Sequence, residues 1–414
     1  MIRILEATQA TKIFERRAAR VEEAEAVVRP ILEAVRKRGD KALVEYAKKF
    51  DGLEGSSVQV PQEALRKAAA ELDPDFSSAV KTASNNIRGY ARLQLPKPFR
   101  KALAPGIRLG QILRPLDCVA AYIPSGRYPL PSTLMMTVIP AQIAGVPNIL
   151  VASPKPNREI YGTAAMLEVH QVFQMGGAHA IAAFAFGTKT VPKADRIVGP
   201  GNIYVAAAKK LLAGEVGIDF VAGPTEILII SNEGDPRWLA ADMLAQAEHD
   251  VEAAAILLTP SRRLGNAVAL EIEKQMADLP TAKVARKSID KNSAIVIVSS
   301  LDHAVELSNQ FAPEHLSIPE MRLLDAVKHA GSVFVGPNSP EAAGDYAAGP
   351  SHVLPTNGAA RLRGGLTAAD FVKVISVQEL NGEALRRLGP TITTLARAEG
   401  LEAHARSVEV RLGK

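Results

Sequence analysis

Residues 226 to 258 read Glu-Ile-Leu-Ile-Ile, then Ser-Asn-Glu-Gly, then Asp-Pro-Arg-Trp-Leu-Ala-Ala-Asp-Met-Leu-Ala-Gln-Ala-Glu-His-Asp, and finally Val-Glu-Ala-Ala-Ala-Ile-Leu-Leu. The first and last pieces contain short apolar runs, which predict strands. Between them, Asp235 can cap a helix, Pro236 suits its first turn, and apolar residues recur at helical spacing from Leu239 to Leu244. A strand, a helix and a second strand in this order predict part of a parallel sheet.

The same alternation of helices and strands extends from about residue 132 to residue 335. It indicates parallel sheets covered on both faces, and a single sheet of so many strands would be unusual. We therefore expect an α/β fold with two Rossmann-like parallel-sheet domains. Residues before about 95 read as helices, and those after 366 read as short helical pieces with a charged tail. The expected division is an N-terminal helical segment (1–20), a first domain (21–118 with 227–365), a second domain (119–226) and a C-terminal tail (366–414).

The composition is that of an ordinary globular protein. Of 414 residues, 47% are hydrophobic and 22% are charged, and the net charge is +5. Basic residues form no long run and are not interleaved with aromatics, so nucleic acid is not an expected partner. Because the N-terminus has no apolar signal segment and no run has the length of a membrane span, we expect a cytoplasmic protein with no membrane partner. The single cysteine, Cys118, excludes a disulfide framework and a Cys-rich zinc site.

Two polar residues lie near the end of the helix quoted above. Gln246 and His249 are three positions apart and therefore share a face. An amide oxygen and an imidazole can supply half of a metal site. A polar helix end whose histidine interacts with the helix dipole has the same pattern. This stretch alone leaves both interpretations open.

Two loops carry further candidate groups. Glu314 and His315 are neighbours in Ala-Pro-Glu-His-Leu, and at a loop tip both can reach one cleft and share proton transfer near neutral pH. A surface pair at a turn has the same sequence. Gly199-Pro-Gly-Asn202 follows a predicted strand and precedes a helix, which suits the approach of a phosphate but is also common in ordinary turns.

Asp345 with His352, and Glu399 with His404, lie in similar polar segments punctuated by glycine or proline. The sequence contains no complete dinucleotide fingerprint, no Walker A motif, no His-Glu-x-x-His motif and no Gly-x-Ser-x-Gly elbow. Any metal site must therefore be assembled by the fold from separate segments.

Taken together, the motifs resemble one family over nearly the whole chain, the L-histidinol dehydrogenases. The resemblance rests on ordered segments, which are Ile-Pro-Ala-Gln-Ile-Ala-Gly-Val (139–146), Gly-Gly-Ala-His-Ala-Ile-Ala-Ala-Phe-Ala-Phe-Gly-Thr (176–188), Gly-Pro-Gly-Asn (199–202), Ala-Gly-Pro-Thr-Glu (222–226), Gln-Ala-Glu-His-Asp (246–250), Ala-Pro-Glu-His-Leu-Ser-Ile (312–318), Gly-Asp-Tyr-Ala-Ala-Gly-Pro-Ser-His-Val-Leu-Pro-Thr (344–356) and Glu-Gly-Leu-Glu-Ala-His (399–404).

The resemblance implies an enzyme that oxidises L-histidinol to L-histidine with NAD and zinc, through a bound aldehyde, in the last step of histidine biosynthesis. It also implies a homodimer in which the swapped C-terminal tail completes the partner's site. The implied catalytic residues are Glu314 and His315, and the implied zinc ligands are Gln246, His249, Asp345 and His404. The implied substrate contacts are Thr225, Gln246, His249, His315, Asp345, Glu399 and His404, with His352 as a neighbour. The implied NAD contacts are Tyr122, His179 and Asn202.

The sequence departs from the family pattern at three positions. His179 replaces the usual glutamine at an NAD contact, and either side chain can donate a hydrogen bond, so we expect altered affinity for NAD. Thr225 replaces serine, which keeps the hydroxyl and adds a methyl group in the substrate pocket. Ser125 replaces a glycine in the loop 124–126.

Three alternatives follow from the same residues. A related dehydrogenase could oxidise another polar alcohol, such as a sulfonated propanediol. A zinc hydrolase could use Glu314 to activate water without any nucleotide. A non-catalytic binding protein is disfavoured, because each catalytic position carries a competent side chain.

Overall fold

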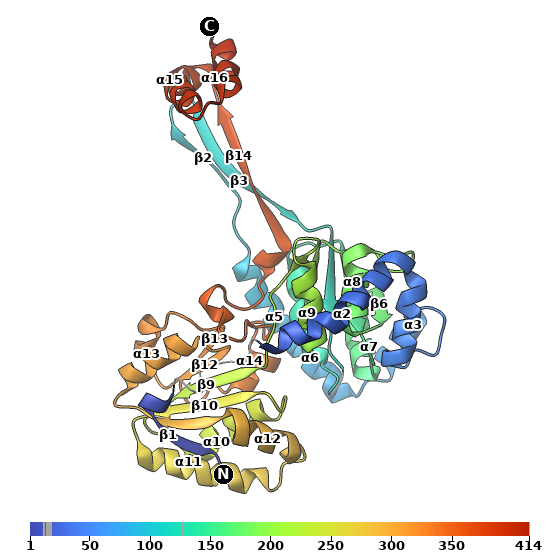
Figure 1. The fold of residues 1–414 in the computed structure, drawn as a ribbon, viewed down its shortest axis with the longest axis vertical. Coiled ribbons are helices and arrows are strands. Elements are labelled where there is room, and N and C mark those ends of the chain that lie inside the picture. The colour runs from blue at the N-terminus through green and yellow to red at the C-terminus, as the bar shows by residue number, and fades with distance from the viewer. Residues whose placement is uncertain (11–12, 14–18, 126–127, 414) are drawn as a thin grey trace.

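The computed structural model describes residues 1–10, 13, 19–125 and 128–413. Figure 1 shows two lobes and a long arm that carries the C-terminus at its tip. Each lobe contains one parallel sheet with helices on both faces, so the predicted α/β fold with two parallel-sheet domains is confirmed. Within the described residues, no helix is long and apolar enough to cross a membrane.

The first lobe is built on a six-stranded sheet with all neighbours parallel. Its strand order is β1 (Arg3–Glu6), β11 (Ala294–Ile297), β10 (Ala254–Thr259), β9 (Glu226–Ile230), β12 (His315–Ile318) and β13 (Ser332–Val335). One face is covered by α10 (Pro236–Ala247), α11 (Arg262–Met276) and α12 (Ala282–Asn292), and the other by α13 (Leu301–Phe311) and η2 (Met321–Ala326). A short helix, α14 (Glu341–Tyr346), follows β13 and contacts α10.

The strand–helix–strand stretch forms as predicted. Every residue of β9 is buried, as expected for an apolar run in a central parallel strand. The Asp235 carboxylate accepts a hydrogen bond from the Arg237 N–H at 2.9 Å, and Pro236 begins α10. The helix therefore begins where the capping residues indicated.

The first correction concerns the N-terminus. Residues 3 to 6 were expected to be helical but form β1, which pairs in parallel with β11 at the edge of the first sheet. The rest of the expected helical segment 1–20 lies partly outside the described residues. The strand escaped detection because a four-residue edge strand carries little periodicity and its partner lies near residue 295.

The second lobe contains a five-stranded parallel sheet. Its strand order is β6 (Gln171–Gln174), β5 (Asn148–Ser153), β4 (Cys118–Tyr122), β7 (Arg196–Val198) and β8 (Gly217–Ile218). One face is covered by α2 (Ala19–Arg38), α3 (Asp40–Asp51), α8 (Gly177–Phe186) and α9 (Ile203–Leu212). The other is covered by α4 (Gln62–Ala70), α5 (Pro74–Gln94), α6 (Pro131–Ile143) and α7 (Arg158–Met166).

This packing differs from the expected domain division. Helices α2 to α5 bury their apolar faces on the second sheet, whereas residues 21–118 were expected to belong with the first. The chain thus enters the first sheet at β1, builds most of the second lobe and then returns to the first at β9. A series of amphipathic helices predicts that their apolar faces pack on a sheet, but the pattern does not identify which of the two sheets.

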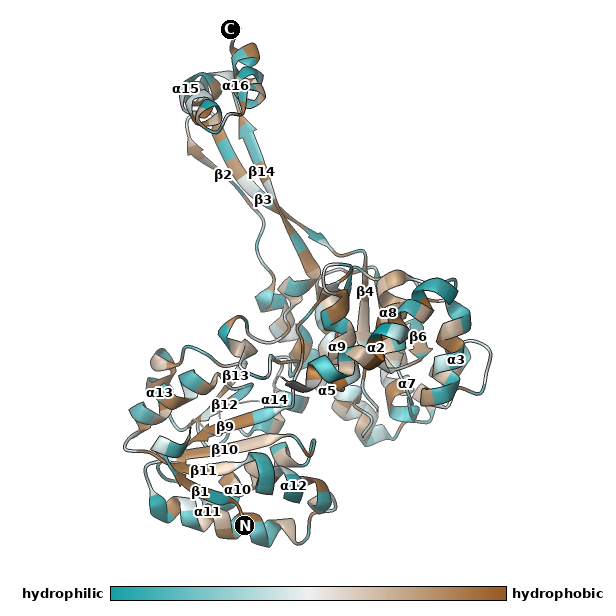
Figure 2. Cartoon of the chain, viewed as in Figure 1, coloured by the Kyte–Doolittle hydropathy of each residue, from teal (hydrophilic) through white to brown (hydrophobic). Residues whose placement is uncertain are grey.

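The arm is the third part of the molecule. It consists of an antiparallel sheet in the order β14 (Val372–Leu380), β3 (Ile107–Pro115) and β2 (Phe99–Ala104), followed by α15 (Gly382–Ala398), α16 (Glu402–Glu409) and η5 (Val410–Leu412). Two short 3₁₀ helices, η3 (Ala359–Arg361) and η4 (Ala368–Phe371), precede β14. Residues 366–414 were expected to form short helical pieces, which is wrong for residues 372–380, a nine-residue strand. Figure 2 shows hydrophobic and hydrophilic residues interspersed along the arm, away from both lobes.

Candidate active site

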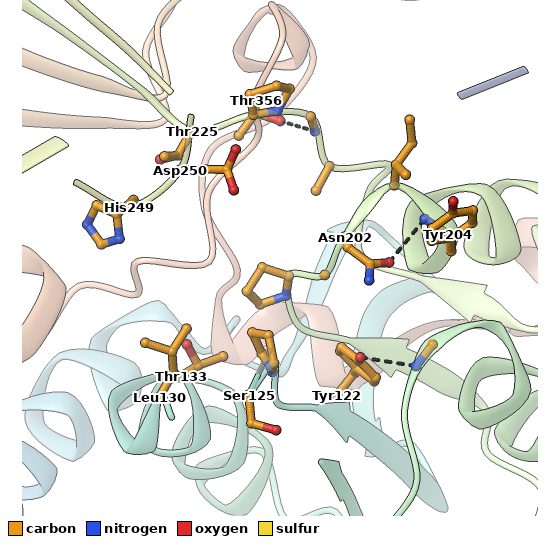
Figure 3. A pocket seen from close by; sticks show the side chains of 18 of the residues that line it. Tyr122, Ser125, Leu130, Thr133, Asn202, Tyr204, Thr225, His249, Asp250 and Thr356 are labelled. Atoms are coloured by element: carbon orange, nitrogen blue, oxygen red, sulfur yellow. Dashed lines mark hydrogen bonds between the residues drawn. The ribbon is translucent and has the colours of Figure 1, made fainter. Parts of the chain in front are cut away.

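One cavity of about 1010 Å³ lies between the two lobes. Figure 3 shows Tyr122, Ser125 and Asn202 on one side of it and Thr225, His249 and Asp250 on the other. On the second sheet the lining loops follow β4, β5, β6 and β7, so the cavity lies at the carboxyl ends of these strands, as expected for a parallel sheet.

The first sheet presents the opposite ends of its strands to the cavity. Thr225 directly precedes β9, and Glu314 directly precedes β12, where His315 is the first residue. Since β9 and β12 are parallel neighbours, their amino ends place the two loops side by side. The loops 222–226 and 312–316 thus reach the cavity from the amino ends of their strands, whereas ligands of parallel sheets usually bind at the carboxyl ends.

His315 lines the cavity from the first lobe and is 4% exposed. Its Nδ1 lies 3.1 Å from the Glu226 carbonyl oxygen, which can only accept, so Nδ1 carries the hydrogen of the neutral ring. Its Nε2 is buried without a hydrogen-bond partner among the described residues, and the nearest carboxylate oxygen, from Asp345, is 3.6 Å away. Nε2 is therefore the atom through which the ring can exchange a proton.

Carboxylates surround this ring. Glu341 approaches Nδ1 to 3.1 Å and Glu314 approaches it to 3.7 Å. Burial alone would lower the pKa of His315, but the charges of Glu341, Glu314 and Asp345 outweigh it and raise the pKa above the ordinary range. The site thus favours positive charge at His315.

Glu314 lies beside His315 with only 5% of its surface exposed. Its carboxylate accepts hydrogen bonds from the Thr225 hydroxyl at 2.6 Å and from the Glu226 N–H at 2.8 Å. Burial raises the pKa of Glu314 to about 7, against the opposing effects of the His315 charge and the Thr225 hydroxyl. A carboxyl group with this pKa can take up and release a proton near neutral pH.

Two of the expected metal ligands, His249 and Asp345, line the cavity, and a third, Gln246, is buried next to Thr225 at its edge. Gln246 is fully buried at the end of α10 with its amide 2.7 Å from the Thr225 hydroxyl. His249 Nε2 lies 3.9 Å from an oxygen of Asp345. Burial would raise the pKa of Asp345, but interactions with His315, His352 and His249 bring it below its usual value, so this group is anionic.

His352 is hydrogen-bonded to the main chain of Asp345 within the cavity. Its Nδ1 lies 2.7 Å from the Asp345 carbonyl and its Nε2 lies 3.0 Å from the Thr133 hydroxyl. Burial lowers the pKa of His352, which keeps the ring neutral. Both ring nitrogens are engaged, so this histidine positions its neighbours.

Glu341 is a component that the sequence reasoning missed. It is 3% exposed, and with His315 and Asp345 it forms a group whose ligand-type atoms all lie within 4.8 Å of one another. It also faces the Gln246 amide across 3.1 Å when the amide nitrogen points toward it. The sequence spacing could have indicated Glu341, because residues 341 and 345 are four positions apart and share one face of a helix.

The opposite side of the cavity carries the expected nucleotide contacts. The Tyr122 hydroxyl accepts a hydrogen bond from the Gly177 N–H at 3.2 Å, and the Asn202 side chain accepts from the Tyr204 N–H at 3.1 Å at the start of α9 (Figure 3). His179 is 1% exposed, and its Nε2 lies 2.7 Å from an oxygen of Asp51. Asp51 was also missed, because it belongs to α3 and reaches the site only through packing.

Comparison with known proteins agrees with this geometry. A family model described as histidinol dehydrogenase matches residues 14–412. The chain belongs to the histidinol dehydrogenase family. It is accordingly an oxidoreductase, and the family resemblance seen in its motifs is confirmed.

Individual histidinol dehydrogenases match along nearly their whole length. The chain is 48% identical to the one from Thermus thermophilus, over 94% of this chain and 94% of the relative, and 47% identical to the one from Aquifex aeolicus, over 94% and 93%. The crystal structure of histidinol dehydrogenase from Elizabethkingia anophelis is similar with a TM-score of 0.95 at 34% identity, covering 100% of this chain and 98% of that one.

Two residues singled out by the family resemblance are not part of this cavity within one chain. Glu399 directly follows α15 and His404 lies on α16, so both lie at the exposed tip of the arm. The chain therefore places His249 and Asp345 in the cavity and Gln246 next to Thr225, but leaves its own His404 on α16 at the tip of the arm, far from both lobes (Figure 1).

Proposed function

We propose that this member of the histidinol dehydrogenase family oxidises L-histidinol to L-histidine in two NAD-dependent steps, with a divalent zinc ion in the site, as the last step of histidine biosynthesis in the cytoplasm. The observation that carries the proposal is that Glu314 and His315 line one cavity together with His249, Asp345 and the expected nucleotide contacts.

The donor set around His249 suits zinc. An imidazole, a carboxylate and an amide oxygen are hard or borderline donors, and Asp345 is held anionic by its neighbours. The buried, unpartnered Nε2 of His315 points to a group that is bound at this place during the reaction. Gln246, His249 and Asp345 would hold the ion, which when bound would supply fixed positive charge to orient the substrate's nitrogen atoms.

His315 would act as the base for the alcohol. Its Nδ1–H is held by the Glu226 carbonyl, which directs Nε2 into the cavity. The positive charge of the bound ion would oppose the surrounding carboxylates and so favour the neutral ring, with a free lone pair on Nε2. Nε2 would accept the hydroxyl proton while NAD accepts the hydride. The surrounding carboxylates would stabilise the imidazolium that results.

Glu314 would act in the second oxidation. With a pKa of about 7, its carboxylate can take a proton from water near neutral pH. The water would add to the aldehyde to give a hydrate, which can lose a second hydride to NAD. The Thr225 hydroxyl orients the Glu314 carboxylate at 2.6 Å.

The arm supports a dimer with shared sites. Its sheet and helices project away from both lobes (Figure 1). Apolar side chains on the arm, such as those of Val374, Leu395 and Val410, are exposed. Such a surface is expected to be covered by a second copy of the chain. We infer that Glu399 and His404 complete the partner's site, with His404 as the fourth metal ligand and Glu399 facing a cationic part of the substrate.

The main experiment counts products. Purified protein with zinc, L-histidinol and NAD should give two NADH per histidine formed. One NADH per histidinol with free aldehyde would overturn the two-step reaction, and no oxidation of histidinol would leave another polar alcohol as the substrate. Hydrolysis without NAD binding would favour the hydrolase instead.

The shared site has its own test. A chain carrying Glu314→Gln and a chain carrying His404→Ala should each form little or no histidine alone. Their heterodimer would contain one intact site if His404 acts in the partner, so co-expressing the two chains should restore activity. If His404 acts within its own chain, both sites of the heterodimer stay defective and no activity returns.

A further inference from the structure

A buried ion pair lies directly beneath the nucleotide side of the cavity. Lys209, on α9, is 2% exposed, and Asp219, which follows β8, is 6% exposed. The Lys209 ammonium donates to a carboxylate oxygen of Asp219 at 2.6 Å. Neither residue lines the cavity, so the pair cannot touch a ligand there directly.

The ion pair forms hydrogen bonds with both the N–H and the carbonyl group of Gly199. Lys209 donates a second hydrogen bond to the Gly199 carbonyl at 2.7 Å. The other carboxylate oxygen of Asp219 accepts from the Gly199 N–H at 2.8 Å. Gly199 is the first residue of the Gly199–Asn202 turn, and the three residues that follow it line the cavity.

Gly199 needs such support because of where its backbone lies. Its φ angle is +108°, and a Cβ atom there would lie 2.2 Å from the Tyr122 carbonyl oxygen. The turn thus lies close against the end of β4, and the positive φ angle of Gly199 does not continue the strand conformation of β7. Buried peptide groups without partners are costly, and Lys209 and Asp219 supply those partners.

The same carboxylate organises a second loop of the cavity. The Phe220 N–H donates to Asp219 at 2.7 Å, and Phe220 lines the cavity. Arg363 holds the Asp219 carbonyl at 2.8 Å, so the backbone of Asp219 is anchored independently of Lys209. Loss of Lys209 therefore frees the Gly199 carbonyl while Asp219 stays anchored by its main chain.

A buried charge pair is an expensive way to stabilise a fold, since apolar residues of similar volume often serve as well or better. We propose that Lys209 and Asp219 are positioning residues that hold the Gly199–Asn202 turn in the shape required by the nicotinamide dinucleotide and thereby set the affinity for it. The inference rests on the proposed use of NAD at this cavity.

The test measures NAD binding by calorimetry on the zinc-loaded protein, together with the KM for NAD, the KM for histidinol and kcat. Lys209→Met keeps the length of the side chain and removes its donors, and it should weaken NAD binding about tenfold or more. The KM for NAD should rise in parallel, while kcat at saturating NAD and the KM for histidinol change little. Arg286→Met is the matched control, because it removes a charge from the ion pair with Glu273 in the other lobe.

A double variant separates positioning from stability. In Lys209→Met with Asp219→Asn, no buried charge is left unpaired, so thermal stability should recover relative to Lys209→Met alone. The Gly199 carbonyl still lacks its donor, so NAD affinity should remain weak. If the recovered stability restored NAD affinity, the role would be merely structural and the inference would be wrong.

Two further outcomes are distinct. If wild-type protein binds NAD and Lys209→Met binds it equally well, the inference is overturned and the proposed function stands. If the wild-type protein binds no NAD, the proposed function fails and the inference falls with it. Should Lys209→Met not fold, the near-isosteric Asp219→Asn variant alone must still show the selective rise in the KM for NAD.

Discussion

Replacing Glu314 by glutamine changes the charge of a buried group with little change in shape, and its effect on stability can be worked out from the structure. The carboxyl group is 5% exposed, and burial raises its pKa from 4.5 to about 7. The folded protein therefore binds this proton more tightly than the unfolded chain does. The contribution of the protonated carboxyl group to the free energy of unfolding is fully present below about pH 4.5. It decreases as the pH rises toward about 7 and is absent above that pH.

Each tenfold change in a protonation equilibrium corresponds to about 1.4 kcal/mol, so ionising Glu314 in the folded state costs about 3 kcal/mol. Because glutamine cannot ionise, the free energy of unfolding of the variant does not include this cost at high pH. The free energy of unfolding of Glu314→Gln, relative to wild type, should rise by about 3 kcal/mol between about pH 4 and about pH 8.

The assay is urea unfolding at a series of pH values on metal-free protein, because a bound cation would add its own charge to the site. A difference between the two proteins that does not change with pH would refute the reasoning, since Glu314 would then titrate as it does in the unfolded chain.

In catalysis, the variant should release the first NADH of a single turnover and slow the second by about 10²–10⁴-fold. Two equivalents of NADH at the wild-type rate would exclude Glu314 as the group that activates water.

Three further changes have defined outcomes. Thr225→Val removes a hydrogen bond that lowers the pKa of Glu314, so the acidic limb of the pH–rate profile for aldehyde oxidation should move to higher pH. His249→Ala should lose bound zinc and activity together, as measured by elemental analysis and NADH production, and zinc retained at wild-type stoichiometry would show that the ligand set is wrong. Gly199→Ala should abolish NAD binding in calorimetry, because the new Cβ would lie 2.2 Å from a backbone carbonyl oxygen. Gly214→Ala is its control, since Gly214 also has a positive φ angle but open space around it, and NAD binding should persist.

Much of the architecture could be predicted from local patterns. Apolar runs such as residues 226–230 are strands because only a central parallel strand buries both of its faces, and the helix at 236–247 begins at its capping residues. The strand at residues 372–380 was missed because it lies in an arm, where most of its residues are exposed and no buried face imposes a clear pattern. Its partner strand, residues 107–115, precedes it by more than half of the chain.

The residues of the candidate site were found in part by the same reasoning. Glu314 and His315 are neighbours in the sequence and carry recognisable chemistry, and the family motifs pointed to Gln246 and His249. Glu341 was missed because its proximity to His315 arises only when the loop after β13 folds back over the amino end of β12.

The sequence by itself determined the chemical groups, most of the strands and helices, and the family to which the chain belongs. The tertiary structure decided which groups became neighbours. It joined the amino ends of β9 and β12 to the carboxyl ends of β4 and β7 around one cavity, brought Asp51 to His179, and kept His404 at the tip of the arm. The physical reason is that local pattern depends on backbone propensity and the spacing of apolar residues, whereas the meeting of distant segments depends on which buried faces fit together.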